Sequence, residues 1–202
     1  MFIFYCPGPL HCDVLCDRKT VTGLSGAAGT FLLLHLLQIN LSMGLSMSRQ
    51  RVKKIQKTLQ RRKLDAVLIT EPHNRRYLSG YTVADHGIQE SSGVLLIPKK
   101  GKPWLLTDSR FSLQAEEEAY GFTVEVCKKG LYALLKKLLP ALNVRCLGFE
   151  SRYFLHSSAG KLEKMMRKIK VEAVPLLDLV ERMRVIKSEE EIRLLRKSVL
   201  LN

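Results

Sequence analysis

The chain has 202 residues, of which 46% are hydrophobic, so it can bury one ordinary core and a single domain is the default expectation. The formal net charge is +14, and residues 1–46 contain as many acidic as basic residues, so the whole excess lies in residues 47–202. The odd number of cysteines, without matched spacing, argues against a disulfide framework and against a zinc site.

The positive charge raises the question of a nucleic-acid partner or an anionic surface. The basic pairs are Lys53-Lys54, Arg61-Arg62, Arg75-Arg76, Lys128-Lys129 and Lys136-Lys137. Because these pairs are dispersed, mostly over separate predicted helices, we favour a solvated surface over a nucleic-acid footprint. The cysteines are best explained as reduced thiols, which favours a cytoplasmic protein.

Residues 1–46 differ from the rest of the chain. No charge occurs from Val21 to Ile39, and the apolar run at 31–37 follows Arg18-Lys19, as in a signal peptide or a short membrane anchor. The run is short for a membrane span and no small-residue cleavage motif follows it. We therefore interpret this segment first as a mis-assigned upstream extension, with a signal or anchor second and a disordered segment as a further alternative; a membrane partner is not expected.

The body of the chain opens with a predicted helix over 49–63, whose apolar residues recur at helical spacing. A continuous apolar run at 65–70 predicts a buried strand. Residues 73–81 predict one or two helical turns, closed by Gly80 with a positive φ. A polar loop follows at 82–92.

Two strands around the turn at 99–102 predict a β-hairpin over 93–108. Asp108 is placed to cap a helix over 109–120. The residues expected on the buried face of that helix are Phe111, Leu113, Ala115 and Ala119. The remaining predicted elements are strands 122–127, 145–149 and 171–174, helices 131–142 and 154–169, and exit helices beginning at Pro175. This alternation predicts an α/β domain with a largely parallel or mixed sheet.

Three carboxylates, Glu71, Asp108 and Glu150, follow predicted strands, where ligands of open α/β sheets usually bind. Three such groups could hold a divalent cation and activate water, as in a metal nuclease. The sequence pattern alone does not place the three within metal-bridging distance of one another, and each has a structural interpretation: a strand exit, a helix cap and a turn. We favour the structural interpretation. His86 and Tyr81 flank the polar loop, where a single histidine is usually solvated. No zinc-protease, phosphate-loop or nucleophile-elbow motif occurs.

The end of the chain carries a helix-start signal. Ser188 followed by Glu191 forms a capping box, which predicts a helix beginning at Ser188. Ile192, Leu195 and Val199 then fall on one face. We interpret this helix as a connector that leads out of the preceding domain.

A series of sequence blocks, in a defined order, resembles the N-terminal domain of the creatinase, prolidase and Xaa-Pro aminopeptidase family over residues 49–201. The blocks are the helix at 51–59, the strand Leu64–Thr70, Asn74 with Tyr77–Tyr81, Leu105–Phe111 with Gln114-Ala115, Leu147–Glu150, and Arg184–Ser188 with Glu191-Ile192 and Leu195-Arg196. Each block alone is weak, and their order and spacing make the resemblance specific.

The resemblance implies a three-layer α/β domain at 47–186, with a mixed sheet flanked by helices, of the ribonuclease-H-like type. Residues 187–202 would be the connector helix to a pita-bread catalytic domain, which holds two divalent metal ions and their ligands. No motif of that second domain can be assigned here. The resemblance therefore implies no catalytic residue, no cofactor and no enzymatic activity for the chain by itself.

The resemblance also implies a role for the chain in a proline-specific peptidase: it would form a homodimer, dock to a pita-bread domain and narrow the active-site entrance for proline-containing peptides. The residues implied at the entrance are Tyr81, Asp85, His86 and Glu90. The residues implied in the connector are Arg184, Lys187, Ser188, Glu191, Ile192 and Leu195. The alternative interpretation is a free-standing basic α/β module that binds nucleic acid.

Overall fold

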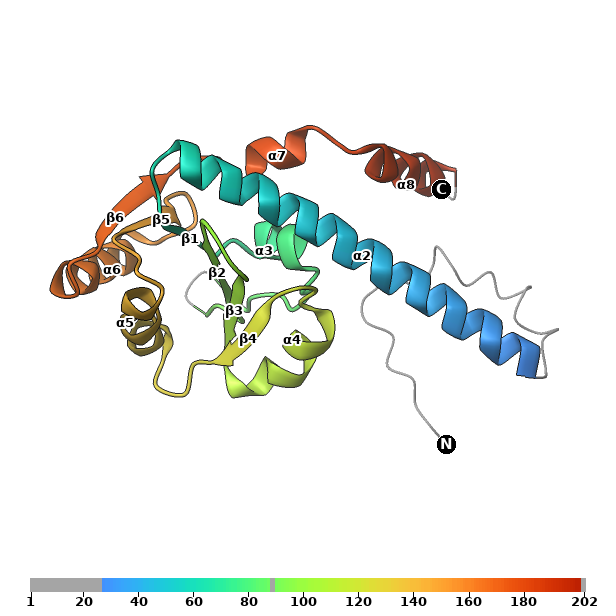
Figure 1. Cartoon of the computed structure of the whole chain (residues 1–202), viewed down its shortest axis with the longest axis horizontal. Helices are drawn as coiled ribbons and strands as arrows, with labels where there is room; N and C mark the ends of the chain where they lie inside the picture. The colour runs from blue at the N-terminus through green and yellow to red at the C-terminus, as the bar shows by residue number, and fades with distance from the viewer. Residues whose placement is uncertain (1–26, 88–89, 201–202) are drawn as a thin grey trace. The chain divides into compact units, whose positions relative to one another are not determined.

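The fold comes from a computed structural model that describes residues 27–87 and 90–200 (Figure 1). The chain divides into two units, of which one is Gly44–Met183 and the other contains the residues before Gly44 together with those from Arg184 onward. The domain boundaries at 46/47 and 186/187 stay predictions. Of the predicted extension at 1–46, residues 1–26 lie outside the described residues.

Helix α2 spans Ala27–Arg61. It starts well before the predicted position near Arg49 and crosses the predicted boundary at residue 46 without a break. The amphipathic pattern that marks a helix begins only at Arg49, but the preceding residues contain no proline, and a glycine such as Gly44 is tolerated inside a helix. Among the described residues, no helix is long and apolar enough to cross a membrane.

In the described part of the chain, six strands form one mixed sheet in the order β4-β3-β2-β1-β5-β6. The central strands β1, β2 and β3 are antiparallel neighbours, whereas β1 with β5, β5 with β6, and β3 with β4 are parallel. The strand bounds are β1 Ala66–Ile69, β2 Val94–Pro98, β3 Trp104–Thr107, β4 Thr123–Val126, β5 Cys146–Glu150 and β6 Glu172–Leu176. The predicted hairpin and the predicted mixed sheet are both confirmed.

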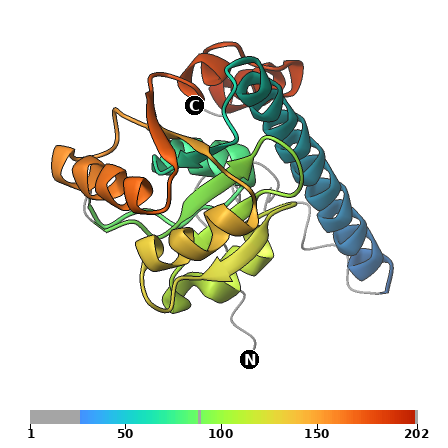
Figure 2. The same ribbon diagram turned by 60° about the vertical axis from the view of Figure 1, so that its left-hand side comes forward.

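Helices cover both faces of the sheet, which gives three layers (Figures 1 and 2). Strand β1 shows how the sequence does this: all four of its side chains are buried, with Val67 and Ile69 in one core and Ala66 and Leu68 in the other. The first core contains side chains of α2, α3 (Pro72–Ser79) and α4 (Ser112–Glu118), and the second contains those of α5 (Leu131–Ala141) and α6 (His156–Lys168). The predicted three-layer α/β class is confirmed.

Two details of the sequence interpretation are wrong around α4. The predicted helix at 109–120 is a 3₁₀ turn, η1 (Ser109–Phe111), followed by α4. Leu113, expected in the core, is 70% exposed. It lies two residues from the buried Ala115, and at about 100° of rotation per residue this places it on the opposite side of the helix.

Pro175 does not begin the exit helices, because it lies inside β6 and pairs in register with Phe149. β6 is an edge strand of the sheet, where a residue without a backbone N–H is tolerated. The exit helices come later, as α7 (Glu181–Val185) and α8 (Glu189–Val199). Glu150 is the last residue of β5, and the turn predicted after it follows at residues 151–153.

The eight-residue helix α3 is defined at both ends by the expected signals. The Glu71 side chain accepts a hydrogen bond from the Asn74 backbone N–H at the start, and Gly80 ends the helix with φ +86°. Gly80 is also crowded, since a Cβ there would lie 2.9 Å from the Tyr120 ring. The helix is therefore held at a fixed place and in a fixed rotation.

From α3, the Arg75 side chain enters the core with 0% exposure. Its guanidinium donates to the carbonyls of Gly93 (2.6 Å) and Val83 (2.7 Å), to Ser92 Oγ (2.8 Å) and to Asp85 Oδ1 (2.9 Å). Asp85 Oδ1 in turn accepts from the backbone N–H of Ser92 (2.8 Å). One buried cation therefore ties both ends of the polar loop to the helix.

The neighbouring Asn74 reaches in another direction, to the end of the sheet. Its amide Nδ2 donates to Glu150 Oε1 and to Glu181 Oε1, both at 2.7 Å. Glu150 Oε2 accepts from the backbone N–H groups of Thr70 (2.6 Å) and Glu71 (2.8 Å). Asn74 thus links the ends of β1 and β5 to the first residue of α7.

Burial, partly offset by these hydrogen bonds and reinforced by the Glu181 charge, raises the pKa of Glu150 to about 7. Glu150 has an ordinary pKa of 4.5. The folded state therefore holds the proton more tightly than the unfolded chain does. The resulting contribution to stability is complete below pH 4.5 and is lost as the pH rises to about 7.

We predict that the free energy of unfolding falls by roughly 3 kcal/mol from Glu150 alone as the pH rises across this window. Glu150→Gln should flatten that slope, because a neutral amide has no proton to lose. Urea unfolding at several pH values measures the effect. Glu117→Gln, at an exposed position of α4, is the matched control and should keep the slope; equal slopes for Glu150→Gln and the parent chain would refute the assignment.

We predict that Arg75→Met destabilises the fold by about 3–5 kcal/mol, because it leaves the buried Asp85 carboxylate without its cation. The neighbouring Arg76 is exposed, and Arg76→Met is expected to change stability very little. Denaturant unfolding of the two variants checks the difference, and similar losses for both would contradict the role given to Arg75.

Candidate functional site

The loop after α3 has a buried base and an exposed tip. Of the four residues implied at the entrance, Tyr81 is fully buried, and the Asp85 side chain is 3% exposed and bonded to Arg75. His86 and Glu90 are exposed, and the Glu90 N–H donates to the Gly87 carbonyl (3.1 Å). The structure therefore brings Tyr81 and Asp85 into the scaffold and leaves only the other two open to a partner.

A second anchor holds the start of the loop. Glu118, at the end of α4, accepts from the backbone N–H of Thr82 (2.7 Å) and from its hydroxyl (2.8 Å), and Gln114 Nε2 donates to the same carboxylate (2.8 Å). Sequence reasoning missed Glu118 and Arg75, since both resemble ordinary charged residues of amphipathic helices. The one available signal was that each residue lies two positions from the end of a predicted helix, at 73–81 or 109–120.

The three candidate carboxylates do not form one site. Glu71 caps α3, and its pKa is lowered because the hydrogen bonds from His73 and the Asn74 N–H outweigh the effect of burial. Asp108 caps η1 and pairs with Arg110 (2.7 Å), whose hydrogen bond lowers the Asp108 pKa. Within the described ranges, no three His, Cys, Asp or Glu side chains lie close enough to hold a metal ion.

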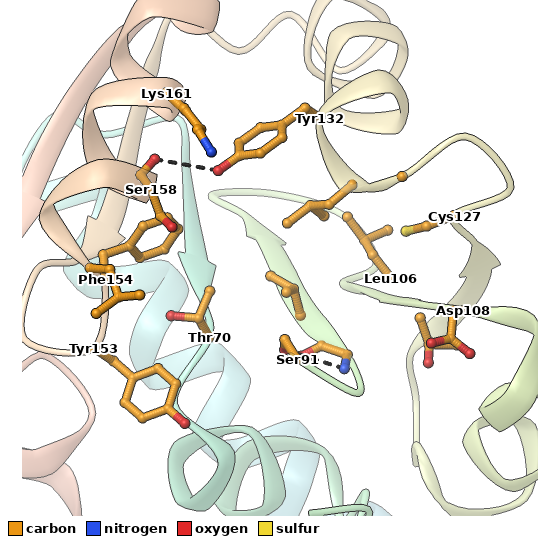
Figure 3. Close-up of a pocket in the computed structure, with 16 residues that line it drawn as sticks. Thr70, Ser91, Leu106, Asp108, Cys127, Tyr132, Tyr153, Phe154, Ser158 and Lys161 are labelled. Atoms are coloured by element: carbon orange, nitrogen blue, oxygen red, sulfur yellow. Dashed lines mark hydrogen bonds between the residues drawn. The ribbon is translucent and has the colours of Figure 1, made fainter. Parts of the chain in front are cut away.

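A cavity of about 380 Å³ lies at the carboxyl edge of the sheet (Figure 3). It lies where strands β1, β3 and β4 end and α5 and α6 begin, the usual ligand position in open α/β sheets. Its polar lining includes Thr70, Asp108, Tyr132 and Lys161, and the Tyr132 hydroxyl donates to the Ser158 carbonyl (3.3 Å). The cavity combines these polar groups with apolar residues such as Leu106 and Phe154.

Cys127 is the thiol in that cavity. Burial, together with the nearby Asp108 and Glu125 charges, raises its pKa to about 11. The thiol is therefore protonated at neutral pH and is a poor nucleophile. Asp108 is occupied by Arg110, so the lining offers polar contacts without an activated nucleophile.

Helix α8, for which the connector role stays a prediction, begins as predicted. The Glu191 N–H donates to Ser188 Oγ (3.3 Å) and the Ser188 N–H donates to Glu191 Oε2 (2.8 Å), which completes the capping box. Leu195 is 54% exposed and Ile192 is half-buried. Ahead of the helix, Lys187 is exposed and donates to the Val185 carbonyl (3.2 Å), and Arg184 is half-buried.

Comparison with known proteins places these features in a family. The uncharacterized peptidase YqhT of Bacillus subtilis is 27% identical over 135 residues, which cover 67% of this chain and 35% of YqhT. The structure of an Xaa-Pro dipeptidase from Bacillus anthracis matches with a TM-score of 0.62 and 29% identity, over 72% of this chain and 38% of the dipeptidase.

A third match is a domain by itself. The crystal structure of the N-terminal domain of the cytoplasmic peptidase PepQ from Mycobacterium tuberculosis H37Rv matches with a TM-score of 0.58 and 28% identity, over 67% of this chain and 98% of that domain. The chain thus spans little more than a third of YqhT and of the dipeptidase but nearly all of the isolated domain. Residues 51–186 match the Creatinase/Prolidase N-terminal domain, and the chain belongs to that family.

Proposed function

We propose that the chain serves as the non-catalytic N-terminal domain of an Xaa-Pro aminopeptidase or dipeptidase. The observation that carries the proposal is its coverage: it aligns with almost the whole of an isolated PepQ N-terminal domain and with only 38% of an Xaa-Pro dipeptidase. In this proposal the two divalent metal ions and their ligands belong to a pita-bread domain that the chain serves. The PepQ match also supports a cytoplasmic location.

The proposed work of the domain is to form a homodimer and to shape the active-site entrance for proline-containing peptides. The anchored loop supports this role, because a segment that excludes large substrates must keep its position. Arg75 and Glu118 fix the base of the loop, and His86 and Glu90 at the exposed tip are the side chains that would meet a peptide. Tyr81 and Asp85 would act by holding the tip in place.

Helix α8 would carry the link to the pita-bread domain. Its apolar residues Leu195 and Val199 are 54% and 74% exposed, an arrangement suited to packing against another surface. Arg184 and Lys187 lie ahead of the capped start at Ser188 and would form the hinge. Two observations support this role: the exposed apolar residues of α8 and the membership of the chain in the family.

We predict that the purified chain does not hydrolyse Xaa-Pro peptides when Mn²⁺, Co²⁺ or Zn²⁺ is added, because the proposal places the metal ligands in another domain. Release of proline from an Ala-Pro dipeptide measures this, with a full-length Xaa-Pro dipeptidase as the positive control. Metal-dependent turnover that co-purifies with the chain and exceeds the metal-only blank would overturn the proposal.

We predict that the chain forms a dimer, with a mass in sedimentation equilibrium twice the 23.0 kDa of one chain. Removing the apolar side chains of α8 with Leu195→Asp and Val199→Asp should leave that mass unchanged if α8 serves the catalytic domain and not the dimer. A monomer at every concentration would contradict the dimerisation role, and a monomer only in the α8 variant would move the dimer contact to α8.

A further inference from the structure

A basic surface forms where two segments distant in sequence meet. The C-terminal part of α2 packs beside the turn between β2 and β3, because Gln56 Nε2 donates to the carbonyls of Pro98 (3.0 Å) and Gly101 (2.9 Å). Gln60 Nε2 adds a hydrogen bond to the Lys99 carbonyl (3.2 Å). Basic residues that are dispersed along the chain are therefore gathered on one side of the domain.

We define the basic face as five exposed residues of these two segments, Arg49, Lys53, Lys57, Lys100 and Lys102. Arg49, Lys53 and Lys57 are four residues apart along α2, so they form a row with a spacing of about 6 Å. Neither segment contains an acidic residue, since residues 44–64 and 98–104 lack Asp and Glu. The next acidic residue along the chain after residue 64, Asp65, is already bonded to Lys99 (2.6 Å).

The basic face borders a groove. A hollow of about 330 Å³ runs between α2 and the turn, and its lining includes Arg49, Lys53, Gln56 and Gly101. Gly101 has φ +91°, and a Cβ added there would meet nothing within 4 Å, so no side chain blocks the groove at this point. A chain of negative charge could therefore lie along the helix with cations on both sides.

We propose that the basic face binds the phosphate backbone of nucleic acid, in addition to the peptidase role and independently of it. Evenly spaced cations without nearby carboxylates fit a regularly charged polymer. The basic face contains no aromatic residue, so binding through its cations should be independent of sequence. The groove beside it is lined in part by the half-buried Tyr120.

Other partners fit the face less well. A second copy of the chain also carries +14, so two basic faces would repel each other. An amphipathic helix on a lipid surface needs an apolar side to insert, and Val52, Ile55 and Leu59 of α2 are all buried in the domain core. The exposed apolar residues lie on other elements, such as Leu113 and Leu177.

Fluorescence anisotropy of the full chain with a labelled single-stranded oligonucleotide of mixed sequence tests the proposal. We expect binding at about 50 mM salt, and a slope of log K against log salt of about −3.5 if the five cations each meet a phosphate. A duplex of the same sequence should bind with a steeper slope, since its counterion release per contact is larger.

The decisive variant is Lys53→Gln/Lys57→Gln/Lys102→Gln. It should raise Kd at least about tenfold at low salt and make the slope shallower by about 2. The matched control, Lys136→Gln/Lys164→Gln/Lys168→Gln, removes the same charge from exposed positions of α5 and α6, over the other core, and should change Kd much less. Unchanged melting temperatures show that both variants fold.

Three results would overturn the proposal. The first is no anisotropy change at low salt. The second is an equal loss in the two triple variants, which would assign binding to net charge and not to the face. The third is displacement of the oligonucleotide by polyglutamate as effectively as by unlabelled oligonucleotide, which would show recognition of acidic polypeptides in place of phosphates. Hydrolysis and dimerisation are measured separately, so none of these results bears on the peptidase role.

Discussion

The buried guanidinium of Arg75 is the constraint on which the loop after α3 depends. A cation removed from water destabilises a fold unless acceptors and a counter-charge are near. Both Nη atoms of Arg75 have such partners, whereas its Nε has none. The acceptors here come from the loop itself, at Val83, Asp85, Ser92 and Gly93. A segment without helix or strand geometry therefore has one favoured path, because only that path satisfies the cation. The freedom that remains is at the tip, near His86.

The same short helix also holds the ends of β1 and β5. Arg75 points to the loop and Asn74, its neighbour, bridges Glu150 and Glu181. Two adjacent side chains of α3 thus fix the loop after α3 and the first residue of α7. This explains why both ends of so short a helix are well defined, by the Glu71 cap and by Gly80: a rotation of α3 would break both networks at once. It also explains why Glu150 tolerates burial, since its acceptors are saturated by fixed donors.

The sequence was sufficient where one local signal determines one structure. Apolar runs and turn residues predicted the strands, and the capping box predicted the start of α8 at Ser188. Sequence reasoning failed where tertiary contacts determine which side chains are buried. Leu113 looked buried because it is apolar, yet helix rotation places it in water. Arg75 and Arg76 were both expected in solvent, and no local sequence feature distinguishes the buried Arg75 from the exposed Arg76. Tyr81 and Asp85 were predicted at the exposed entrance, but both side chains are buried by partners that only the fold brings near.

The basic pairs also show that the sequence does not reveal which side chains the fold brings together. Along the chain they are dispersed, which favoured a solvated surface. The fold changes this for one group only, because Gln56 and Gln60 hold the turn at residues 99–102 against the helix that carries Lys53 and Lys57. The pair Lys136-Lys137 lies on α5, which packs on the other core. Net charge alone therefore does not identify a binding surface; the arrangement of the charges does, and here it is set by two uncharged glutamines. Among the described residues no cluster of metal-ligating side chains forms, and the exposed features include the loop tip near His86 and the row of cations on α2.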